Sequence, residues 1–118
     1  DDDQKALMAR AYYYEDMVDD ASHILTNLIN NGYNDKTAYF TLGNVYNKQK
    51  DYKTAIYYWE KAVELDPTYP EALFNIGVGY LYLNDLPKAR TYWDKVLQSN
   101  PDSVTLRAAE EALKGTEF

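Results

Sequence analysis

The sequence predicts an all-α protein: an α-solenoid of three antiparallel helix-turn-helix repeats plus a C-terminal capping helix, seven helices in all. Two observations predict this fold class. Residue types recur 34 positions apart, as in Gly43 and Gly77 or Trp59 and Trp93. Within each unit, apolar residues recur every three or four positions, which is the period of one face of an α-helix. A period of this length is typical of stacked helical repeats, because one unit cannot bury its own apolar face.

The repeat extends over many residue types, so chance matching does not explain it. Small, aromatic, charged and helix-ending residues all keep their places when the sequence is shifted by 34. The matching pairs are Phe40 and Phe74, Gly43 and Gly77, Tyr46 and Tyr80, Ala55 and Ala89, Tyr58 and Tyr92, Trp59 and Trp93, Lys61 and Lys95, and Pro67 and Pro101.

The first unit, about residues 2–35, is a degenerate copy. It has Ala9 where the later units have glycine, and Tyr33 where they have the closing proline. Gly32 offers a different stop for its second helix, since glycine commonly follows a helix C-cap. The residues that remain in register are Met8, Ala9, Tyr12, Ala21, Leu25 and Leu28.

The second and third units, about residues 36–69 and 70–103, each contain two helices. We expect these helices at 37–48, 52–65, 71–83 and 86–98. Asp51 and Asp85 stand where the second helix of each unit begins, as expected of N-cap residues. Pro67 and Pro101 end the units, because proline cannot continue a helix.

The last predicted helix, residues 103–114, belongs to a capping segment of about 103–115. Ser103 is positioned to cap it and Gly115 to stop it. Its apolar stripe is Leu106, Ala109 and Leu113, and its other faces are charged. A helix with one apolar and one polar face suits the end of a solenoid, so we expect the array to end here.

The second unit resembles the tetratricopeptide repeat, whose pattern is aromatic, Leu-Gly, Tyr, Ala, aromatic, Ala and Pro. The matching residues are Tyr39, Leu42, Gly43, Tyr46, Ala55, Trp59, Ala62 and Pro67, and the third unit matches with Leu73, Ile76, Gly77, Tyr80, Ala89, Trp93 and Pro101. Val96 departs from the small residue expected near the end of the second helix. The resemblance covers nearly the whole chain and implies a right-handed superhelix within one domain, residues 1–118.

The packing of each unit follows from residue size. Gly43 and Gly77 lack a side chain, which lets the first helix lie close to the second, where Ala55 and Ala89 are the small partners. Most tyrosines are expected at packing positions. Core positions are expected for Tyr12, Tyr39, Tyr46, Tyr52 and Tyr80, and partial burial for Tyr57, Tyr58 and Tyr92, whereas packing does not readily explain Tyr13, Tyr14 and Tyr82.

Composition limits the classes of partner. The chain of 118 residues has a formal net charge of −7, which disfavours nucleic acid because phosphate binding needs clustered Lys and Arg. The chain has no cysteine, so thiolate metal sites and disulfides are absent. No apolar run reaches the roughly 20 residues needed to insert through a bilayer. Because the chain begins at Asp1 without a methionine, we expect a processed or partial chain, and preceding repeats or a targeting segment stay open.

The residues do not form an enzyme site, so we predict no catalytic activity, cofactor or metal. His23 is the only histidine and is expected to face solvent. Gly77-Val78-Gly79 falls within a helix and lacks a third glycine, which argues against a phosphate loop. The acidic cluster Glu15, Asp16, Asp19 and Asp20 does not have EF-hand spacing. N-capping and a favourable helix dipole explain it better than calcium.

The resemblance implies that the first helix of each repeat lines a concave groove that binds another protein or a peptide. Amide and aromatic side chains there suit a peptide, since amides pair with its backbone and aromatics anchor its side chains. Packing between adjacent first helices is the alternative role for Phe40 and Phe74. The candidate site residues are Arg10, Tyr13, Tyr14, Phe40, Asn44, Asn47, Lys48, Phe74, Asn75, Val78 and Tyr82.

The resemblance also allows one partner class to be tested. Tetratricopeptide domains that bind chaperone C-terminal tails clamp carboxylates with lysine, asparagine and arginine. The matching positions are Ala6, Arg10, Thr41, Glu71 and Asn75, which are mostly not cationic, so we expect no such ligand. A partner that is not strongly acidic is favoured by the net charge. The alternative function is a structural module that assembles through repeat or convex surfaces, and oligomerisation stays open.

Overall fold

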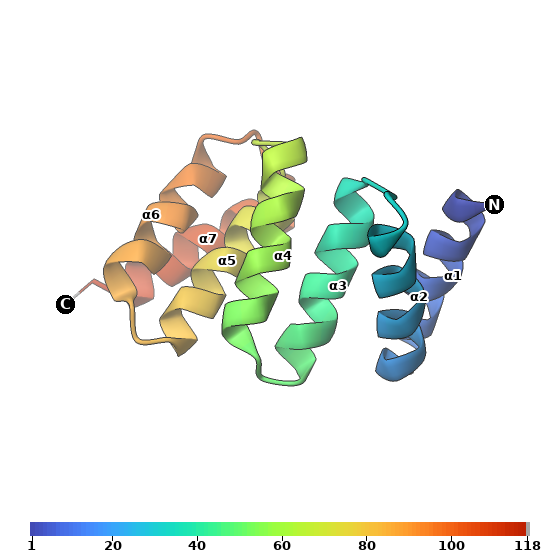
Figure 1. Ribbon diagram of the computed structural model, residues 1–118. Coiled ribbons are helices and arrows are strands. Elements are labelled where there is room, and N and C mark those ends of the chain that lie inside the picture. Colours follow the sequence, from blue (N-terminus) through green and yellow to red (C-terminus); the bar gives the residue numbers. More distant parts are fainter. Residues whose placement is uncertain (118) are drawn as a thin grey trace.

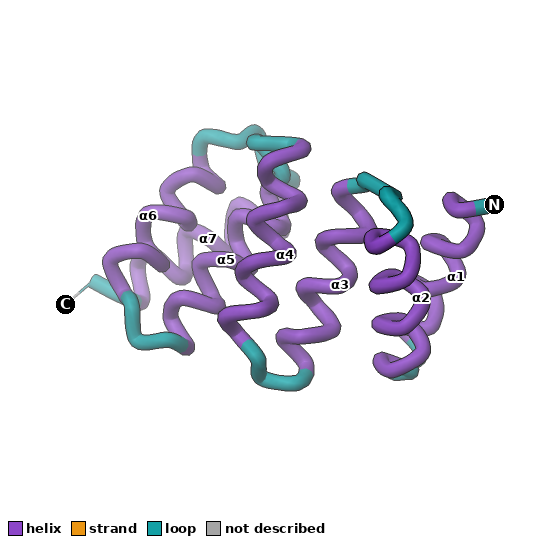
Figure 2. The backbone as a smooth tube through the Cα atoms, viewed as in Figure 1, coloured by secondary structure: helices purple, strands orange, loops and turns teal. Residues whose placement is uncertain are grey.

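The computed structural model describes residues 1–117, and that part of the chain contains seven α-helices and no strand. The helices stack as antiparallel pairs in a row measuring 47 × 27 × 23 Å (Figures 1 and 2). This confirms the predicted all-α helical repeat, while Phe118 lies outside the described residues. The helices are α1 (Asp2–Tyr14), α2 (Val18–Asn30), α3 (Lys36–Lys48), α4 (Tyr52–Leu65), α5 (Pro70–Tyr82), α6 (Leu86–Leu97) and α7 (Ser103–Gly115).

Helices α4 and α6 begin after the N-cap residues that the sequence predicted. Asp51 accepts a hydrogen bond from the backbone N–H of Thr54, and Asp85 accepts one from the N–H of Lys88. Each carboxylate thereby satisfies one of the free donors of a helix N-terminus. Gly32 follows the C-cap of α2 with φ +94°, which confirms the predicted stop because glycine adopts this conformation without strain.

The turns between the two helices of each unit share one backbone conformation. Asp16, Lys50 and Asn84 all have φ of 62–63°, and they are equivalent positions of the repeat. A residue in the left-handed region closes the end of a helix and lets the chain reverse. None of the three is glycine, so a sequence search for glycine punctuation misses these turns.

Three predicted caps were wrong. Asp102, not Ser103, caps α7, because its carboxylate accepts from both the N–H and the hydroxyl of Thr105, at 2.7 and 3.1 Å. Gly115 is the last residue of that helix, and Thr116 is its C-cap. At α2 the N-cap is Met17, which makes no side-chain cap. The acidic residues nearby therefore act on the helix through charge in its first turn.

The glycine contact between paired helices involves tryptophan. A Cβ added to Gly43 would overlap the indole ring of Trp59, and one added to Gly77 would overlap that of Trp93. Both indoles are almost completely buried. The predicted close approach is present, but it is an indole ring rather than an alanine that occupies the space opposite each glycine.

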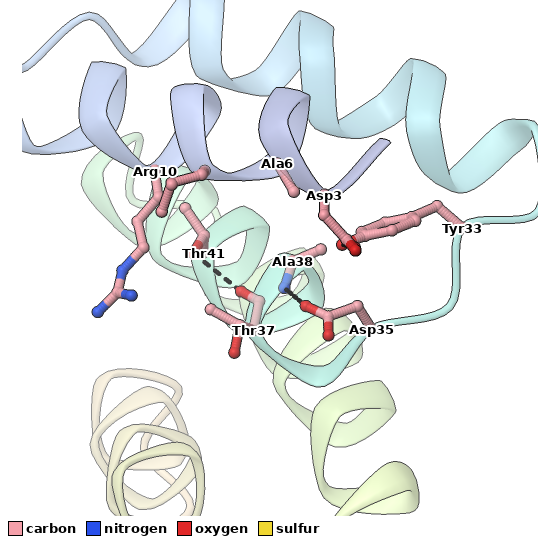
Figure 3. Close-up of a pocket in the computed structure, with 9 residues that line it drawn as sticks. Asp3, Ala6, Arg10, Tyr33, Asp35, Thr37, Ala38 and Thr41 are labelled. Atoms are coloured by element: carbon pink, nitrogen blue, oxygen red, sulfur yellow. Dashed lines mark hydrogen bonds between the residues drawn. The ribbon is translucent and has the colours of Figure 1, made fainter. Parts of the chain in front are cut away.

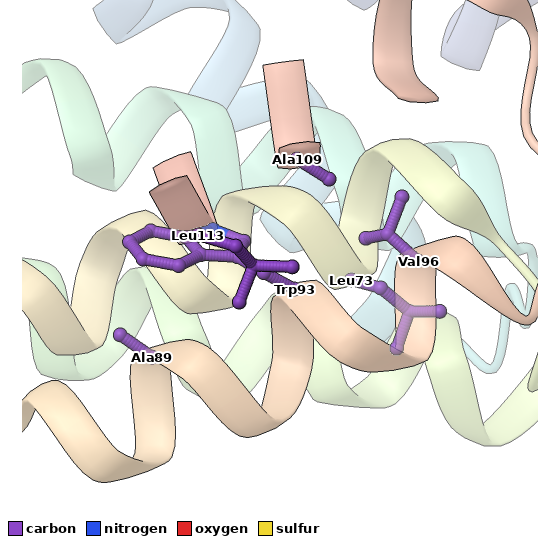
Figure 4. Close-up of a cluster of buried hydrophobic side chains, with 6 residues drawn as sticks. All are labelled: Leu73, Ala89, Trp93, Val96, Ala109 and Leu113. Carbon is purple, nitrogen blue, oxygen red and sulfur yellow. The ribbon is translucent and has the colours of Figure 1, made fainter. Parts of the chain in front are cut away.

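Helix α7 closes the apolar face of the third unit. Its residues Ala109 and Leu113 join Leu73, Trp93 and Val96 in one buried cluster (Figure 4). The guanidinium of Arg90 donates to the carbonyl of Leu113 at 2.6 Å, which ties the end of α7 to α6. The tyrosines expected in the core are half-buried instead, namely Tyr12, Tyr39, Tyr46, Tyr52 and Tyr80.

Candidate functional site

A groove of about 390 Å³ lies between the first helices of the repeats and α7. Phe40 from α3 and Phe74 from α5 contribute its aromatic rings, and both are half-buried. Phe40 also lies 5.1 Å from the ring of Tyr69, and Phe74 lies 6.4 Å from that of Trp93. The two phenylalanines therefore pack within the fold and line the groove at once. The groove residues are Tyr13, Tyr14, Phe40, Asn44, Glu71, Phe74, Asn75, Val104, Thr105 and Ala108.

Two amide side chains in the groove are held in one orientation by an indole. The Nε1–H of Trp59 donates to Oδ1 of Asn44 at 3.0 Å, and Nδ2 of Asn75 donates to the same oxygen at 3.2 Å. An indole N–H can only donate, so the Asn44 atom that faces it must be the oxygen. The Asn75 atom facing that oxygen must then be nitrogen. Within residues 1–117 the Asn44 nitrogen and the Asn75 oxygen make no side-chain hydrogen bond, so both can bond a ligand.

Aromatic rings line the α1 end of the groove, and a lysine from α3 packs on one of them. The rings of Tyr13 and Tyr14 meet edge to face at 5.3 Å. The ammonium of Lys48 lies 4.4 Å above the Tyr13 ring and forms an ion pair with Asp16 at 3.2 Å. Burial raises the pKa of Tyr13 and Lys48 opposes the rise, so its phenol is neutral at physiological pH. This end of the groove is aromatic and locally charge-balanced.

An acidic group also lines the groove. Glu71, in the first turn of α5, lines the groove and is half-buried. Burial, and then the negative charge of Glu71, raise the pKa of Tyr69 to about 12. A carboxylate in this position is stabilised by the positive end of the α5 dipole, and it repels an anionic ligand.

Several predicted site residues lie outside the groove. Tyr82 stacks on Tyr52 with ring centroids 4.7 Å apart, and Val78 packs against the buried cluster under α7. Asn47 and Lys48 lie toward the end of α3, and Arg10 lines a separate cavity. The predicted site residues that line the groove are Tyr13, Tyr14, Phe40, Asn44, Phe74 and Asn75, and those that do not are Arg10, Asn47, Lys48, Val78 and Tyr82.

The cavity next to Arg10 is small, about 150 Å³, and lies between α1 and α3. Arg10 extends away from the carboxylates of Asp3 and Asp35 (Figure 3). Asp3 accepts a 2.7 Å hydrogen bond from the hydroxyl of Tyr33, which raises the pKa of that phenol to about 12. The cavity is therefore bordered by carboxylates on one side and a single cation on the other.

Sequence reasoning missed the wall of the groove formed by α7. Val104, Thr105 and Ala108 all line it, and Val104 is 78% exposed. The signal was available, because Val104 and Ala108 stand four residues apart and form a second apolar stripe on that helix. The capping role explains only the stripe of Leu106, Ala109 and Leu113, and Val104 and Ala108 lie on another face of the helix.

Asn44 also has a structural role that the sequence did not indicate. It is one of the candidate site residues, yet it also accepts hydrogen bonds from Trp59 and Asn75. Replacing it would leave a buried indole N–H without its acceptor, which costs stability. Asn44 therefore contributes to the contact between α3 and α4 as well as to the groove.

The chain is an all-α helical repeat protein, and sequence comparison identifies its family. A TPR repeat profile matches residues 43–81 and a tetratricopeptide repeat profile matches residues 70–103. The chain belongs to the tetratricopeptide repeat family. Domains of this family are in general scaffolds for protein–protein interaction without catalytic activity. None of the helices in residues 1–117 has the length and apolar character needed to cross a membrane.

Known proteins extend the comparison. The uncharacterized protein ycf37 of Guillardia theta is 35% identical over 65 residues, which are 55% of this chain and 36% of that protein. The chain thus spans about a third of the length of this relative. The fold of the Yersinia enterocolitica type III secretion translocator chaperone SycD matches with a TM-score of 0.87 at 17% identity, covering 96% of this chain and 81% of SycD. The first TPR of Spaghetti (RPAP3), bound to the HSP90 peptide SRMEEVD, matches with a TM-score of 0.81 at 22% identity, covering 95% and 90% of the two chains.

Proposed function

We propose that this chain binds a peptide segment of a partner protein in the groove between its first helices and α7. The observation that carries the proposal is the oriented pair Asn44 and Asn75, which lies beside the aromatic rings of Phe40 and Phe74. A free amide N–H and a free amide oxygen match the carbonyl and N–H of a peptide group. The rings supply apolar surface for the side chains of that segment.

The chemistry of the partner follows from the charges along the groove. Glu71 lies within it, and the chain has a net charge of −7, so a strongly acidic segment is disfavoured. The residues at the positions of the carboxylate clamp also disfavour a ligand that ends in carboxylates. Arg10 shares its cavity with Asp3 and Asp35, and Ala6 and Thr41 carry no charge (Figure 3). A segment with apolar side chains and neutral or basic flanks suits this surface.

The test selects a ligand and then maps where it binds. Random 12-residue peptides displayed on phage would be selected on the intact protein, and the affinity of a selected peptide measured by titration calorimetry. We expect a dissociation constant of about 1–100 µM. Val104→Asp should weaken binding at least tenfold, since Val104 lines the groove and a carboxylate there would lose water to the apolar side chains of the ligand. Asn75→Leu should weaken it too by removing the free oxygen.

A matched control lies on another face. Tyr57 is exposed on α4, so Tyr57→Ser should leave the affinity within about twofold. Loss of binding in Tyr57→Ser with full binding in Val104→Asp would move the site to the second helices. If no peptide is selected and the mass of the protein in sedimentation rises with concentration, the self-assembly alternative is favoured instead.

A further inference from the structure

Two tyrosines outside the groove stack face to face between the second and third units. Tyr52 is the first residue of α4, and Tyr82 is the last residue of α5. Their ring centroids are 4.7 Å apart, and the ring planes differ by 7°. The α3–α4 turn next to Tyr52 and the α5–α6 turn next to Tyr82 lie on the same edge of the array (Figure 1). The pair therefore bridges two neighbouring units where the chain reverses direction.

This pair combines close ring contact with access from solvent. Among the aromatic pairs within residues 1–117, it has the shortest centroid distance and the smallest interplanar angle. Tyr82 is 60% exposed and Tyr52 is half-buried. By contrast, the rings of Tyr80 and Tyr92 are 5.8 Å apart with an angle of 28° between them, and both hydroxyls donate to Glu60. A small molecule in solution can therefore reach the edge of the Tyr52–Tyr82 stack.

Other groups that are easily oxidised are absent or covered. The chain has no cysteine, so none of its own thiols competes for an oxidant. The indoles of Trp59 and Trp93 are each 1% exposed, and both lie inside the repeats. Exposed phenol rings are therefore the groups that a dissolved oxidant meets first.

Two phenol rings held in contact can undergo a reaction that separate tyrosines undergo only on collision. A one-electron oxidant takes an electron from a phenol, which releases its proton to water and becomes a phenoxyl radical. Unpaired electron density lies on the ring carbons next to the oxygen-bearing carbon, so two radicals in contact join there. Holding two reactants together replaces a collision with an intramolecular step. We propose that Tyr52 and Tyr82 form a site of oxidative modification, where a one-electron oxidant cross-links the two rings as dityrosine.

The reaction balances with two equivalents of the oxidant. Each ring gives up one electron and its phenolic proton, and a bond forms between one Cε atom of Tyr52 and one Cε atom of Tyr82. The hydrogen on each of these carbons then moves to the phenoxyl oxygen, which restores both aromatic rings and both hydroxyls. The product has lost two hydrogen atoms, while the oxidant has gained two electrons and water has taken up two protons. The exposed Tyr82 ring reaches the bonding geometry by rotation about its side-chain bonds, which is fast for exposed residues.

The cross-link would fasten the second unit to the third. It closes a loop of about 30 residues between the start of α4 and the end of α5, which restricts mainly the unfolded chain. Each unit of a solenoid contacts only its neighbours, so the bond also stops the third unit from opening separately from the second. We expect the melting temperature of the cross-linked monomer to rise by about 5–15 °C.

The test oxidises the intact protein with photogenerated ruthenium(III) tris-bipyridyl, a one-electron oxidant, with persulfate as the terminal electron acceptor. We expect dityrosine fluorescence in a product that stays monomeric and has lost two hydrogen atoms. Trypsin separates the two rings, because Tyr52 is the only tyrosine of residues 51–53, and Tyr82 lies in residues 62–88. Mass spectrometry should find these two peptides joined, with fragment ions that place the link at Tyr82.

Matched variants separate ring contact from exposure. Tyr82→Phe keeps the ring but removes the hydroxyl, so the yield of dityrosine in the monomer should fall at least about fivefold. Tyr57→Phe is the control, because Tyr57 is 54% exposed and its ring meets that of Tyr58 edge to face at 5.1 Å. The yield in Tyr57→Phe should stay within about twofold of the parent, since that pair lacks the parallel contact.

The outcomes are decisive for the site and for its effect. A link that maps to another pair of tyrosines, an undiminished yield in Tyr82→Phe, or a mainly dimeric product would each overturn the proposed site. A cross-linked monomer that melts at the temperature of the unoxidised protein would overturn the fastening of the two units.

Discussion

The tightest contact in each repeat predicts a large penalty for the smallest possible change, Gly77→Ala. An alanine Cβ at this position would lie 2.6 Å from Cδ1 and 2.9 Å from Cε2 of the Trp93 indole. Carbon atoms in contact are normally about 3.5–4.0 Å apart, so the ring or the helix must move. Trp93 is buried, and its N–H donates to the carbonyl of Phe74 at 3.3 Å. Moving the ring therefore also weakens a hydrogen bond.

The magnitude follows from three terms. Overpacking a rigid buried contact costs about 1–3 kcal/mol. Weakening the indole hydrogen bond costs about 1 kcal/mol more. Alanine in place of glycine within a helix stabilises the folded state by about 0.5–1 kcal/mol, which offsets part of these costs. The net loss in the free energy of unfolding is about 1–3 kcal/mol, which lowers the melting temperature of a domain of this size by about 4–12 °C.

Thermal and urea unfolding followed by circular dichroism measure the change. Gly115→Ala is the matched control, because Gly115 is also helical but nothing lies within 4 Å of an added Cβ. It should melt at or above the parental temperature. In a Trp93→Leu background the penalty of Gly77→Ala should shrink, since the indole is gone. A Gly77→Ala variant that melts with the parent, or an undiminished penalty without the indole, would refute the packing argument.

Four further changes test other contacts. Asn44→Ala should lose about 1–3 kcal/mol, because the indole N–H of Trp59 loses its acceptor, whereas Asn44→Asp should retain most stability in urea unfolding. Lys50→Gly should gain about 0.5–1 kcal/mol, since Lys50 has φ 63°; no gain would mean that the turn is unstrained. Lys36 holds the pKa of Asp66 below its ordinary 3.8 through a 2.7 Å hydrogen bond. The pair therefore stabilises the folded protein above that pH, and its contribution to the free energy of unfolding is lost as the pH falls below it. The free energy of unfolding should fall less steeply with decreasing pH in Lys36→Met than in the parent. Equal slopes in the two proteins would contradict the pairing of Lys36 with Asp66. Deleting residues 103–118 should expose the apolar face under α7 and cause association in sedimentation, and a monomer with parental melting would show that α7 is no cap.

The sequence predicted most of the scaffold because the scaffold depends on local rules and on a repeated pattern. Helix number, the caps at Asp51 and Asp85 and the stop at Gly32 all follow from short-range chemistry. The turn at Lys50 was less evident, because lysine has no preference for the left-handed conformation that it adopts there. Local signals also misplaced the cap of the last helix by one residue, since Ser and Asp are both good N-cap residues.

The candidate site was harder to predict because it depends on contacts between units. The spacing of the first helices brought Phe40, Asn44 and Phe74 to one surface, and the structure places them along one groove. The bond from Trp59 to Asn44 joins two helices, and no periodicity reveals it. The wall formed by Val104 arises where α7 turns back toward α5, which is a tertiary arrangement. Such features can be read from a pattern only after the packing is known.

One position of the repeat explains why the groove differs along its length. Arg10, Asn44 and Val78 are equivalent residues of the three units. In the second unit Asn44 accepts from its own tryptophan and becomes an oriented donor toward the groove. In the third, Val78 joins the buried cluster, and the indole of Trp93 donates to a backbone carbonyl instead. In the first unit no indole is present, and Arg10 borders the small cavity. The residues that repeat therefore build the scaffold, and the residue that fails to repeat gives each part of its inner surface a separate chemistry.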